Sequence, residues 1–328
     1  MDVLATAPFP EEIRLENTNA CNAHCVICPR EKQTRSLGVI APELVEQIVD
    51  EAKSKKITKF TVQGFGEPLF DRNFCRHLRH IKGQLGCPTF SVSNGSLITP
   101  ELAEELVTCG LDKIKISFYG INKQEYESVH HGLTYERTVA GVTNLIRAKR
   151  AARSKMIIRL QYIGRLWRFL PFVLQWAGKA AVGYTTLHNY GGGRRYQKLR
   201  KRGGRCPIVF EPILQVLWDG RVAACCYDFD GRMILGDLRH QTIAEIWHGE
   251  PYERLRRAQI TGDFAEWPLC WNCDRRRRPL IKLNPRVIGD SSPQPEPAPA
   301  QPVSIFPVRD VADGCPIGAA CSKPVAYR

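Results

Sequence analysis

The stretch "NACNAHCVIC" (residues 19–28) brings three thiols close together: Cys21, Cys25 and Cys28. It follows the β-rich run "EIRLENT", so the thiols are expected on the loop after a first strand. Three thiolates on one loop can hold three corners of a four-iron cluster and leave the fourth iron open. A tetrahedral zinc site with His24 as fourth ligand is the alternative, but zinc motifs usually pair their ligands across a longer loop. We therefore expect an iron-sulfur cluster here.

Beyond this loop, β-rich runs alternate with helical segments from about residue 11 to 190. Six runs are expected as strands: 12–18, 59–65, 89–95, 113–120, 156–164 and 183–191. Amphipathic segments lie between the first five, among them 41–54, 99–110 and 134–152. Six successive β/α units predict an α/β fold in which a parallel sheet curls into a full or partial TIM-like barrel. Such a barrel carries its chemistry at the carboxyl ends of the strands.

The pattern changes after residue 192. The run "ILQVLWDGRVAACCYDFDG" predicts two strands around an Asp-Gly turn, and a helical segment at 242–260 follows. We expect residues 1–192 to form the barrel and residues 193–282 to form a small α+β module. The remainder, 283–328, contains "SSPQPEPAPAQP", which cannot bury enough surface to order itself. A flexible tail is expected there, with no role assigned to its Cys315 and Cys321.

Composition places the chain among globular proteins. It has 43% hydrophobic and 24% charged residues, and no apolar run approaches the ~18 residues of a membrane span. The N-terminus lacks the features of a secretory signal, so a cytoplasmic location is expected. The 13 cysteines are an odd number and several are clustered. In a reducing compartment this pattern indicates metal ligation or catalysis rather than a disulfide framework.

The formal charge of +14 is concentrated in two basic runs, at 194–205 and 274–279. Such runs can attract nucleic acid, and a zinc-containing nucleic-acid-binding protein is one alternative function. However, the runs lack the interleaved aromatic residues of a base-stacking surface. We expect instead that the basic charge attracts an acidic flavodoxin or ferredoxin that serves as electron donor.

With Cys-x3-Cys-x2-Cys after the first strand, the sequence resembles the radical S-adenosylmethionine (radical SAM) enzymes. The resemblance implies a partial (β/α)6 barrel and a 4Fe-4S cluster on Cys21, Cys25 and Cys28, whose open iron binds S-adenosylmethionine (SAM). It also implies reductive cleavage of SAM to methionine and a 5′-deoxyadenosyl radical, which removes a hydrogen atom from the substrate. Ile27 departs from the family, which usually has an aromatic residue there.

The resemblance extends to the ends of three further strands. "GFGEP" is similar to the family's Gly-Gly-Glu-Pro, which receives the methionine ammonium, although Phe65 replaces the first glycine. "VSNGS" and "ISFYG" are similar to segments that bind the ribose or the methionine carboxylate. The implied SAM-binding residues are Gly66, Glu67, Pro68, Ser93, Asn94 and Ser117. On the fifth strand Arg159 and Gln161 point to one side, and either could face the cavity.

Four later cysteines fall in a second recognisable frame: Cys206, Cys225, Cys270 and Cys273. The frame resembles the SPASM/Twitch extension of radical SAM enzymes, which implies a second, auxiliary 4Fe-4S cluster. Four thiolates would saturate one such cluster; a structural zinc on the same thiols is the alternative. Cys226 could replace Cys225, but adjacent strand residues point to opposite faces, so only one is expected as a ligand.

A saturated auxiliary cluster is suited to accept the electron of a substrate radical. The one-cluster layout is similar to that of 2-deoxy-scyllo-inosamine dehydrogenase, which oxidises a sugar-like alcohol. The predicted function is therefore a radical SAM oxidoreductase acting on a small polar or sugar-like molecule, with a peptide-modifying maturase as alternative. No residue is identified as the base that takes the second proton. Cys75, Cys87 and Cys109 are expected to be small buried residues.

Overall fold

The computed structural model describes residues 8–164, 166–185, 187–193, 206 and 208–273. Four predicted features lie outside the described residues: the tail at 283–328, its Cys315 and Cys321, and the basic runs at 194–205 and 274–279. No described helix is both long and apolar enough to cross a bilayer.

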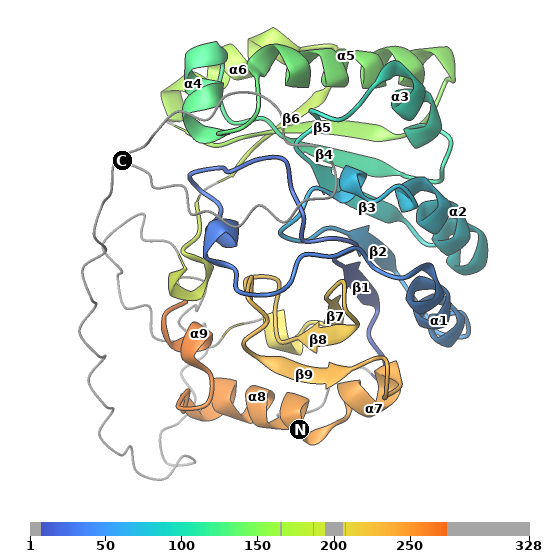
Figure 1. Ribbon diagram of the computed structural model, residues 1–328, viewed down its shortest axis with the longest axis vertical. Helices are drawn as coiled ribbons and strands as arrows, with labels where there is room; N and C mark the ends of the chain where they lie inside the picture. The colour runs from blue at the N-terminus through green and yellow to red at the C-terminus, as the bar shows by residue number, and fades with distance from the viewer. Residues whose placement is uncertain (1–7, 165, 186, 194–205, 207, 274–328) are drawn as a thin grey trace. The chain divides into compact units, whose positions relative to one another are not determined.

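A nine-stranded sheet runs through the described residues in the order β6-β5-β4-β3-β2-β1-β7-β8-β9 (Figure 1). Its strands are β1 (Glu12–Leu15), β2 (Lys59–Val62), β3 (Thr89–Ser93), β4 (Lys113–Ser117), β5 (Ile157–Tyr162), β6 (Ala181–Tyr184), β7 (Ile213–Val216), β8 (Arg221–Ala223) and β9 (Ile234–Asp237). Strands β1 to β7 pair in parallel, and β8 and β9 are antiparallel. The predicted six-stranded partial barrel is confirmed.

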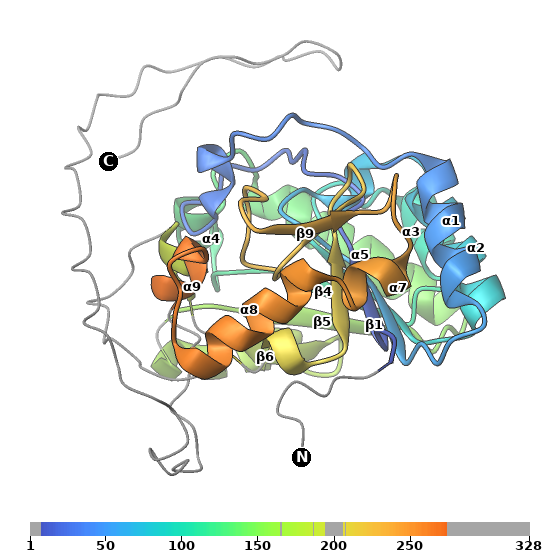
Figure 2. The same cartoon turned by 90° about the horizontal axis from the view of Figure 1, so that it is seen from below.

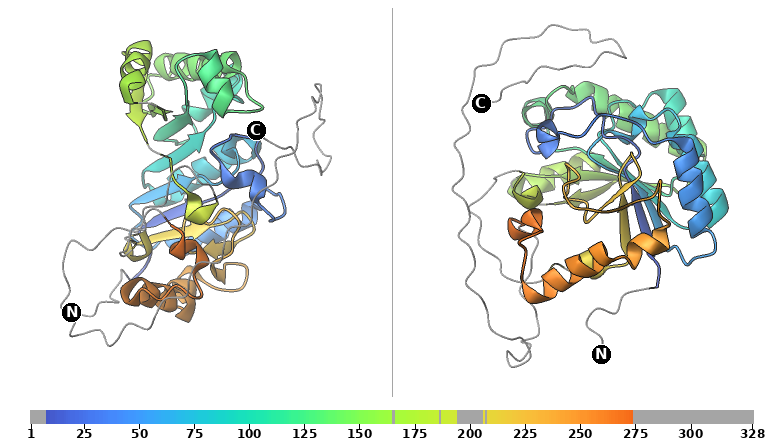
Figure 3. Two further views of the ribbon diagram at one scale, coloured as in Figure 1. Left: turned by 90° about the vertical axis from the view of Figure 1, so that its left-hand side faces the viewer. Right: turned by 60° about the horizontal axis from the view of Figure 1, so that its bottom comes forward.

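Helices cover the outside of the barrel strands (Figure 3, right). They are α1 (Pro42–Ala52), α2 (Phe74–Leu85), α3 (Pro100–Leu106), α4 (Lys123–Val129), α5 (Tyr135–Ala151) and α6 (Phe169–Trp176). Short 3-10 turns lie at η1 (Pro29–Lys32), η2 (Pro68–Phe70), η3 (Leu166–Arg168), η4 (Tyr190–Gly192) and η5 (Ile208–Phe210). Pro42 and Pro100 open α1 and α3 as expected, because the first helical turn needs no N–H from proline.

Strand alternation separates the core from the lumen. On β4, Ile114 and Ile116 are fully buried in the hydrophobic core. The residues between and beside them, Lys115 and Ser117, line a cavity on the other face. Because successive strand side chains point to opposite faces, each barrel strand offers apolar residues to the helices and polar residues to the lumen.

Two elements differ from the sequence prediction. The sixth strand was expected at 183–191, but β6 ends at Tyr184 and most of that run is loop. The helix expected at 242–260 is divided into α7 (Ile243–Trp247) and α8 (Glu250–Thr261). Gly249 caps the second helix and a proline follows at its start, where a continuous helix would lose a hydrogen bond. A last helix, α9 (Pro268–Trp271), follows them.

The second module extends the barrel sheet. β7 pairs in parallel with β1, so the boundary expected after residue 192 falls between two strands of one sheet. The predicted Asp-Gly turn joins β7 to β8, and Gly220 takes the left-handed conformation (φ 89°) that the turn requires. Figure 2 shows α7 and α8 beside β9, which is an edge strand of the sheet. Residues of this module therefore stand next to the lumen of the barrel.

Candidate active site and auxiliary cluster site

A cavity of about 500 Å³ opens at the carboxyl ends of the barrel strands. It is lined by most of the predicted site residues: Cys21, Cys25, Cys28, Gly66, Glu67, Ser93, Asn94 and Ser117. Pro68 does not line the cavity; it is buried beside it, and its carbonyl accepts a hydrogen bond from Asn17 Nδ2 at 2.9 Å. Cys75, Cys87 and Cys109 are buried in the core, as expected.

The three thiols of the cysteine loop are half-buried and free of disulfides. The loop is fixed by backbone hydrogen bonds from His24 N to His131 O (2.7 Å) and from Val26 N to Val129 O (3.0 Å). Burial raises the pKa of Cys21 to about 12 and also raises that of Cys25. Buried thiols of this kind ionise when a metal supplies the compensating positive charge. This set of soft donors fits an iron-sulfur cluster.

His130 was not found by sequence reasoning, and it contacts the cysteine loop directly. Its Nδ1 lies 3.1 Å from Cys25 Sγ, while its Nε2 accepts a hydrogen bond from Tyr119 N at 3.3 Å. Burial lowers the pKa of His130 to about 3, so the ring is neutral. Since Nε2 is the acceptor, the single ring proton is on Nδ1 and is donated to the sulfur. The ring of Tyr119 stacks on the His130 ring, with 4.9 Å between the two ring centres.

Glu67 is buried and holds the ends of two strands together. Its carboxylate accepts hydrogen bonds from Ser93 Oγ (2.7 Å), Asn94 N (2.7 Å) and Leu69 N (3.3 Å). Burial raises the pKa of Glu67 to about 7. The Asn94 side chain is also engaged, with Asn22 and Ser96. Ser93 and Asn94 therefore line the cavity, but their side chains also organise the site.

Gly66 allows the strand end to approach the cysteine loop. A Cβ atom at this position would lie 2.3 Å from Thr18 O and 2.6 Å from Ala20 O. The neighbouring Glu67 N donates to Ala20 O at 2.8 Å. Any side chain at Gly66 would push the two segments apart, so the glycine is required for the close approach.

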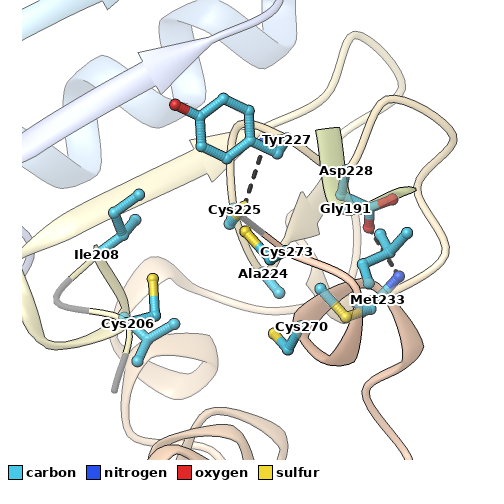
Figure 4. Close-up of a pocket in the computed structure, with 12 residues that line it drawn as sticks. Gly191, Cys206, Ile208, Ala224, Cys225, Tyr227, Asp228, Met233, Cys270 and Cys273 are labelled. Atoms are coloured by element: carbon cyan, nitrogen blue, oxygen red, sulfur yellow. Dashed lines mark hydrogen bonds between the residues drawn. The ribbon is translucent and has the colours of Figure 1, made fainter. Parts of the chain in front are cut away.

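The four auxiliary cysteines line a second pocket, shown in Figure 4: Cys206, Cys225, Cys270 and Cys273. Cys206 precedes η5, Cys225 follows β8, and the last two lie on and just after α9. The remaining lining is largely apolar, including Ile208, Ala224 and Met233. Burial raises the pKa of Cys206, and the pKa of Cys225 is raised by a hydrogen bond with the Cys226 thiol and by burial. Four thiols that line one largely apolar pocket fit a fully ligated cluster.

Cys225 and Cys226 differ in which of the two larger cavities they line, although both also line a smaller pocket beside Gln63 and Gln215. Cys225 lines the auxiliary pocket, whereas Cys226 lines the central cavity, where Arg14 Nη1 lies 3.7 Å from its sulfur. The sequence argument placed the pair in a strand, but β8 ends at Ala223 and Cys226 lies in a turn closed by Asp228 N donating to Cys225 O at 3.1 Å. The placement favours Cys225 as the ligand.

Two protein families match the sequence. The radical SAM superfamily matches residues 15–158. An iron-sulfur cluster-binding domain, SPASM, matches residues 206–274 and therefore includes all four auxiliary cysteines. These matches favour the iron-sulfur interpretation of both sites over the zinc alternatives and over a zinc-containing nucleic-acid-binding protein.

Curated relatives share part of the chain. A probable GTP 3′,8-cyclase of Sulfurisphaera tokodaii is 23% identical over 185 residues, which are 56% of this chain and 58% of the relative. A probable GTP 3′,8-cyclase of Saccharolobus islandicus is 26% identical over 136 residues, 42% of this chain and 44% of the relative. The chain thus spans about half the length of these relatives.

Solved structures share the fold. BtrN in complex with AdoMet and 2-DOIA has a TM-score of 0.58 at 20% identity, covering 82% of this chain and 94% of BtrN. Streptococcus suis SuiB bound to the precursor peptide SuiA has a TM-score of 0.63 at 12% identity, covering 76% and 67%. The enzyme anSMEcpe with AdoMet and the Cp18Cys peptide has a TM-score of 0.59 at 15% identity, covering 83% and 92%.

Proposed function

The chain belongs to the radical SAM superfamily and carries a SPASM iron-sulfur domain, and from this premise we propose that it is an oxidoreductase acting on a small polar, sugar-like alcohol. It is a radical SAM enzyme with two iron-sulfur clusters and SAM as cofactors. The substrate and the net oxidation are the proposal.

We assign the first cluster to Cys21, Cys25 and Cys28, and the auxiliary cluster to Cys206, Cys225, Cys270 and Cys273. When bound, SAM and the first cluster supply a radical that removes a hydrogen atom, and the auxiliary cluster supplies a one-electron acceptor.

The chain's own residues orient SAM and exclude water. We propose that the Glu67 carboxylate, which lines the cavity and accepts hydrogen bonds from Ser93 and Asn94, binds the ammonium group of SAM. Ser117 lines the same cavity, and its hydroxyl accepts from Tyr119 OH at 3.1 Å, which fixes its direction. We propose Ser117 for the ribose or the methionine carboxylate. Phe118 and Tyr126 are buried behind Ser117 and keep water out of this side of the cavity.

The position of the segment at Cys225 and Cys226 is the observation that carries the proposal. One residue lines the auxiliary pocket and the next lines the central cavity. A substrate in the cavity thus lies against the same short segment that lines the acceptor site. Removing one hydrogen atom, one proton and one electron from an alcohol gives a ketone, and this arrangement provides an acceptor close to the substrate.

The test is product analysis with anaerobically purified protein, SAM, a chemical reductant and a panel of polyols and amino polyols. The expected result is a ketone, with 5′-deoxyadenosine formed in equal amount. A product with a new carbon–carbon or carbon–sulfur bond would contradict the oxidation. Mass changes on a co-expressed peptide would instead support the peptide-modifying alternative, which the folds of SuiB and anSMEcpe also accommodate.

A reductant is required by this chemistry, and we propose an acidic flavodoxin or ferredoxin as the donor. The net charge of +14 favours such a partner. Because salt screens the attraction between exposed charges, the rate of cluster reduction should fall as ionic strength rises. A rate independent of salt would contradict this partner.

A further inference from the structure

Cations gather in the part of the lumen that lies toward the amino ends of the barrel strands. Arg14 on β1, Lys59 on β2 and Lys115 on β4 line the central cavity. Lys113 and Arg159 stand beside them. Lys113 begins β4, and Arg159 on β5 is paired in register with Lys115. None of these five residues belongs to the SAM-binding set.

The three lysines of this set surround one aromatic ring. The Nζ atoms of Lys59, Lys113 and Lys115 lie 5.7, 5.7 and 5.8 Å from the centre of the Phe90 ring. The ring face attracts each ammonium, which holds three like charges closer together than they would otherwise stand. Phe90 itself lines the cavity. Lys59 and Lys115 line the cavity beside this ring, and Lys113 contacts the same ring.

One carboxylate is available to neutralise this set. Among the described residues that line the cavity, the acids are Glu12 and Glu67, and Glu67 belongs to the SAM-binding end. Glu12 pairs with Arg14 Nε at 2.7 Å and with Lys59 Nζ at 2.9 Å. In the described part of the chain, Lys113, Lys115 and Arg159 have no acidic partner.

The uncompensated cations are held partly away from water. Burial lowers the pKa of Lys115, and the neighbouring cations Arg159 and Lys113 lower it further. The buried Nε of Arg159 has no hydrogen-bond partner. A Cβ atom at Gly183 on β6 would lie 2.5 Å from that Nε, so the glycine leaves room for the guanidinium. Partly buried charges without partners are costly, and an anionic ligand would remove the cost.

We propose that these five cations form a subsite for a phosphoryl group of the substrate. Three unpaired cations would be neutralised best by an anion that carries about two negative charges in a small volume. A phosphoryl group carries this charge at neutral pH, whereas a single carboxylate carries only one negative charge. The substrate would then be a phosphorylated small molecule, with its phosphoryl group toward the amino ends of the strands and its reacting carbon toward the cysteine loop. This inference rests on the proposed function, because it takes the central cavity as the substrate site.

The experiment measures binding of inorganic pyrophosphate to the full-length, cluster-loaded protein in the presence of SAM, by titration calorimetry. The variants are Lys115→Met and Arg159→Gln, with Lys53→Gln as a control that removes an exposed lysine elsewhere. Saturable binding to the parent protein should weaken at least tenfold in each lumen variant and stay unchanged in the control. Iron content and circular dichroism establish that the variants are folded and loaded.

Three outcomes would overturn the proposal. The first is no saturable pyrophosphate binding, or equal binding in all variants. The second is a loss of SAM affinity that matches the loss of pyrophosphate affinity, because the cations would then serve the SAM carboxylate. The third is binding of the tricarboxylate tricarballylate as tightly as pyrophosphate, because the subsite would then not distinguish a phosphoryl group from carboxylates. If the protein binds pyrophosphate as expected but oxidises no alcohol, the proposed function fails and the subsite stands.

Discussion

The cysteine loop and the auxiliary pocket gather thiols by different means. The loop supplies Cys21, Cys25 and Cys28 from one short segment of the chain. The auxiliary pocket collects its four thiols from the ends of η5, β8 and α9, which are brought together only when the module is folded. The first set is a property of local sequence, and the second is a property of tertiary structure. The two sites should therefore respond differently to mutation.

Replacing Cys21, Cys25 and Cys28 together by alanine should have the largest effect. The iron content should fall from about eight to about four per chain, because only the auxiliary cluster remains. SAM cleavage should fall by at least about 10³-fold, since no open iron is left to bind the cofactor. Iron analysis measures the cluster content, and chromatography of 5′-deoxyadenosine measures SAM cleavage. Cys87→Ala, a buried barrel cysteine, is the control and should change neither.

The neighbours Cys225 and Cys226 allow the second site to be tested by a matched pair. Cys225→Ala should lose about four irons and the oxidised product while retaining SAM cleavage. Cys226→Ala should retain both clusters, because Cys226 lines the central cavity and does not line the auxiliary pocket. Loss of auxiliary iron in Cys226→Ala and not in Cys225→Ala would reverse the assignment.

The buried Glu67 predicts a pH dependence confined to the first site. Its pKa is raised to about 7, so it is increasingly ionised as pH rises from 6 to 8. Since the ionised form attracts the SAM ammonium, the Kd for SAM should fall about tenfold over this range. Calorimetry at the two pH values measures the change. Glu67→Gln should bind SAM more weakly and without this dependence; an unchanged slope would assign the titration to another group.

His130 predicts the smallest effect, on the potential of the first cluster. A hydrogen bond to a cluster sulfur stabilises the more negative, reduced form. Removing a bond that contributes about 1 kcal/mol should lower the one-electron potential by about 40 mV. His130→Phe tests this by redox titration followed with electron paramagnetic resonance. His24→Phe changes an exposed histidine of the same loop and should leave the potential unchanged.

The local site could be predicted from sequence because its spacing and its place after a strand are both visible in one stretch. The strand-end segments at Glu67, Ser93 and Ser117 were predicted from their resemblance to the radical SAM family, and the structure brings them around one cavity. Their roles in binding SAM remain predictions.

Other features depend on contacts between distant segments. His130 follows α4 and is far from Cys25 in the sequence, so the two residues come into contact only in the folded protein. No local sequence pattern therefore predicts this contact. The lumen cations lie on separate strands, and their shared Phe90 contact depends on sheet register. β6 was misplaced because the run after Tyr184 has strand composition, whereas its described residues 185 and 187–189 lie in a loop and Tyr190 begins η4.

The parallel pairing of β7 with β1 has a consequence for how the chain folds. Ile13 pairs with Leu214, so β1 acquires this neighbour only after β7, far later in the chain, has been synthesised. Contacts this distant in sequence slow folding, and until they form β1 presents an unpaired edge. A chain shortened before β7 should therefore aggregate, although every strand of the barrel would be present.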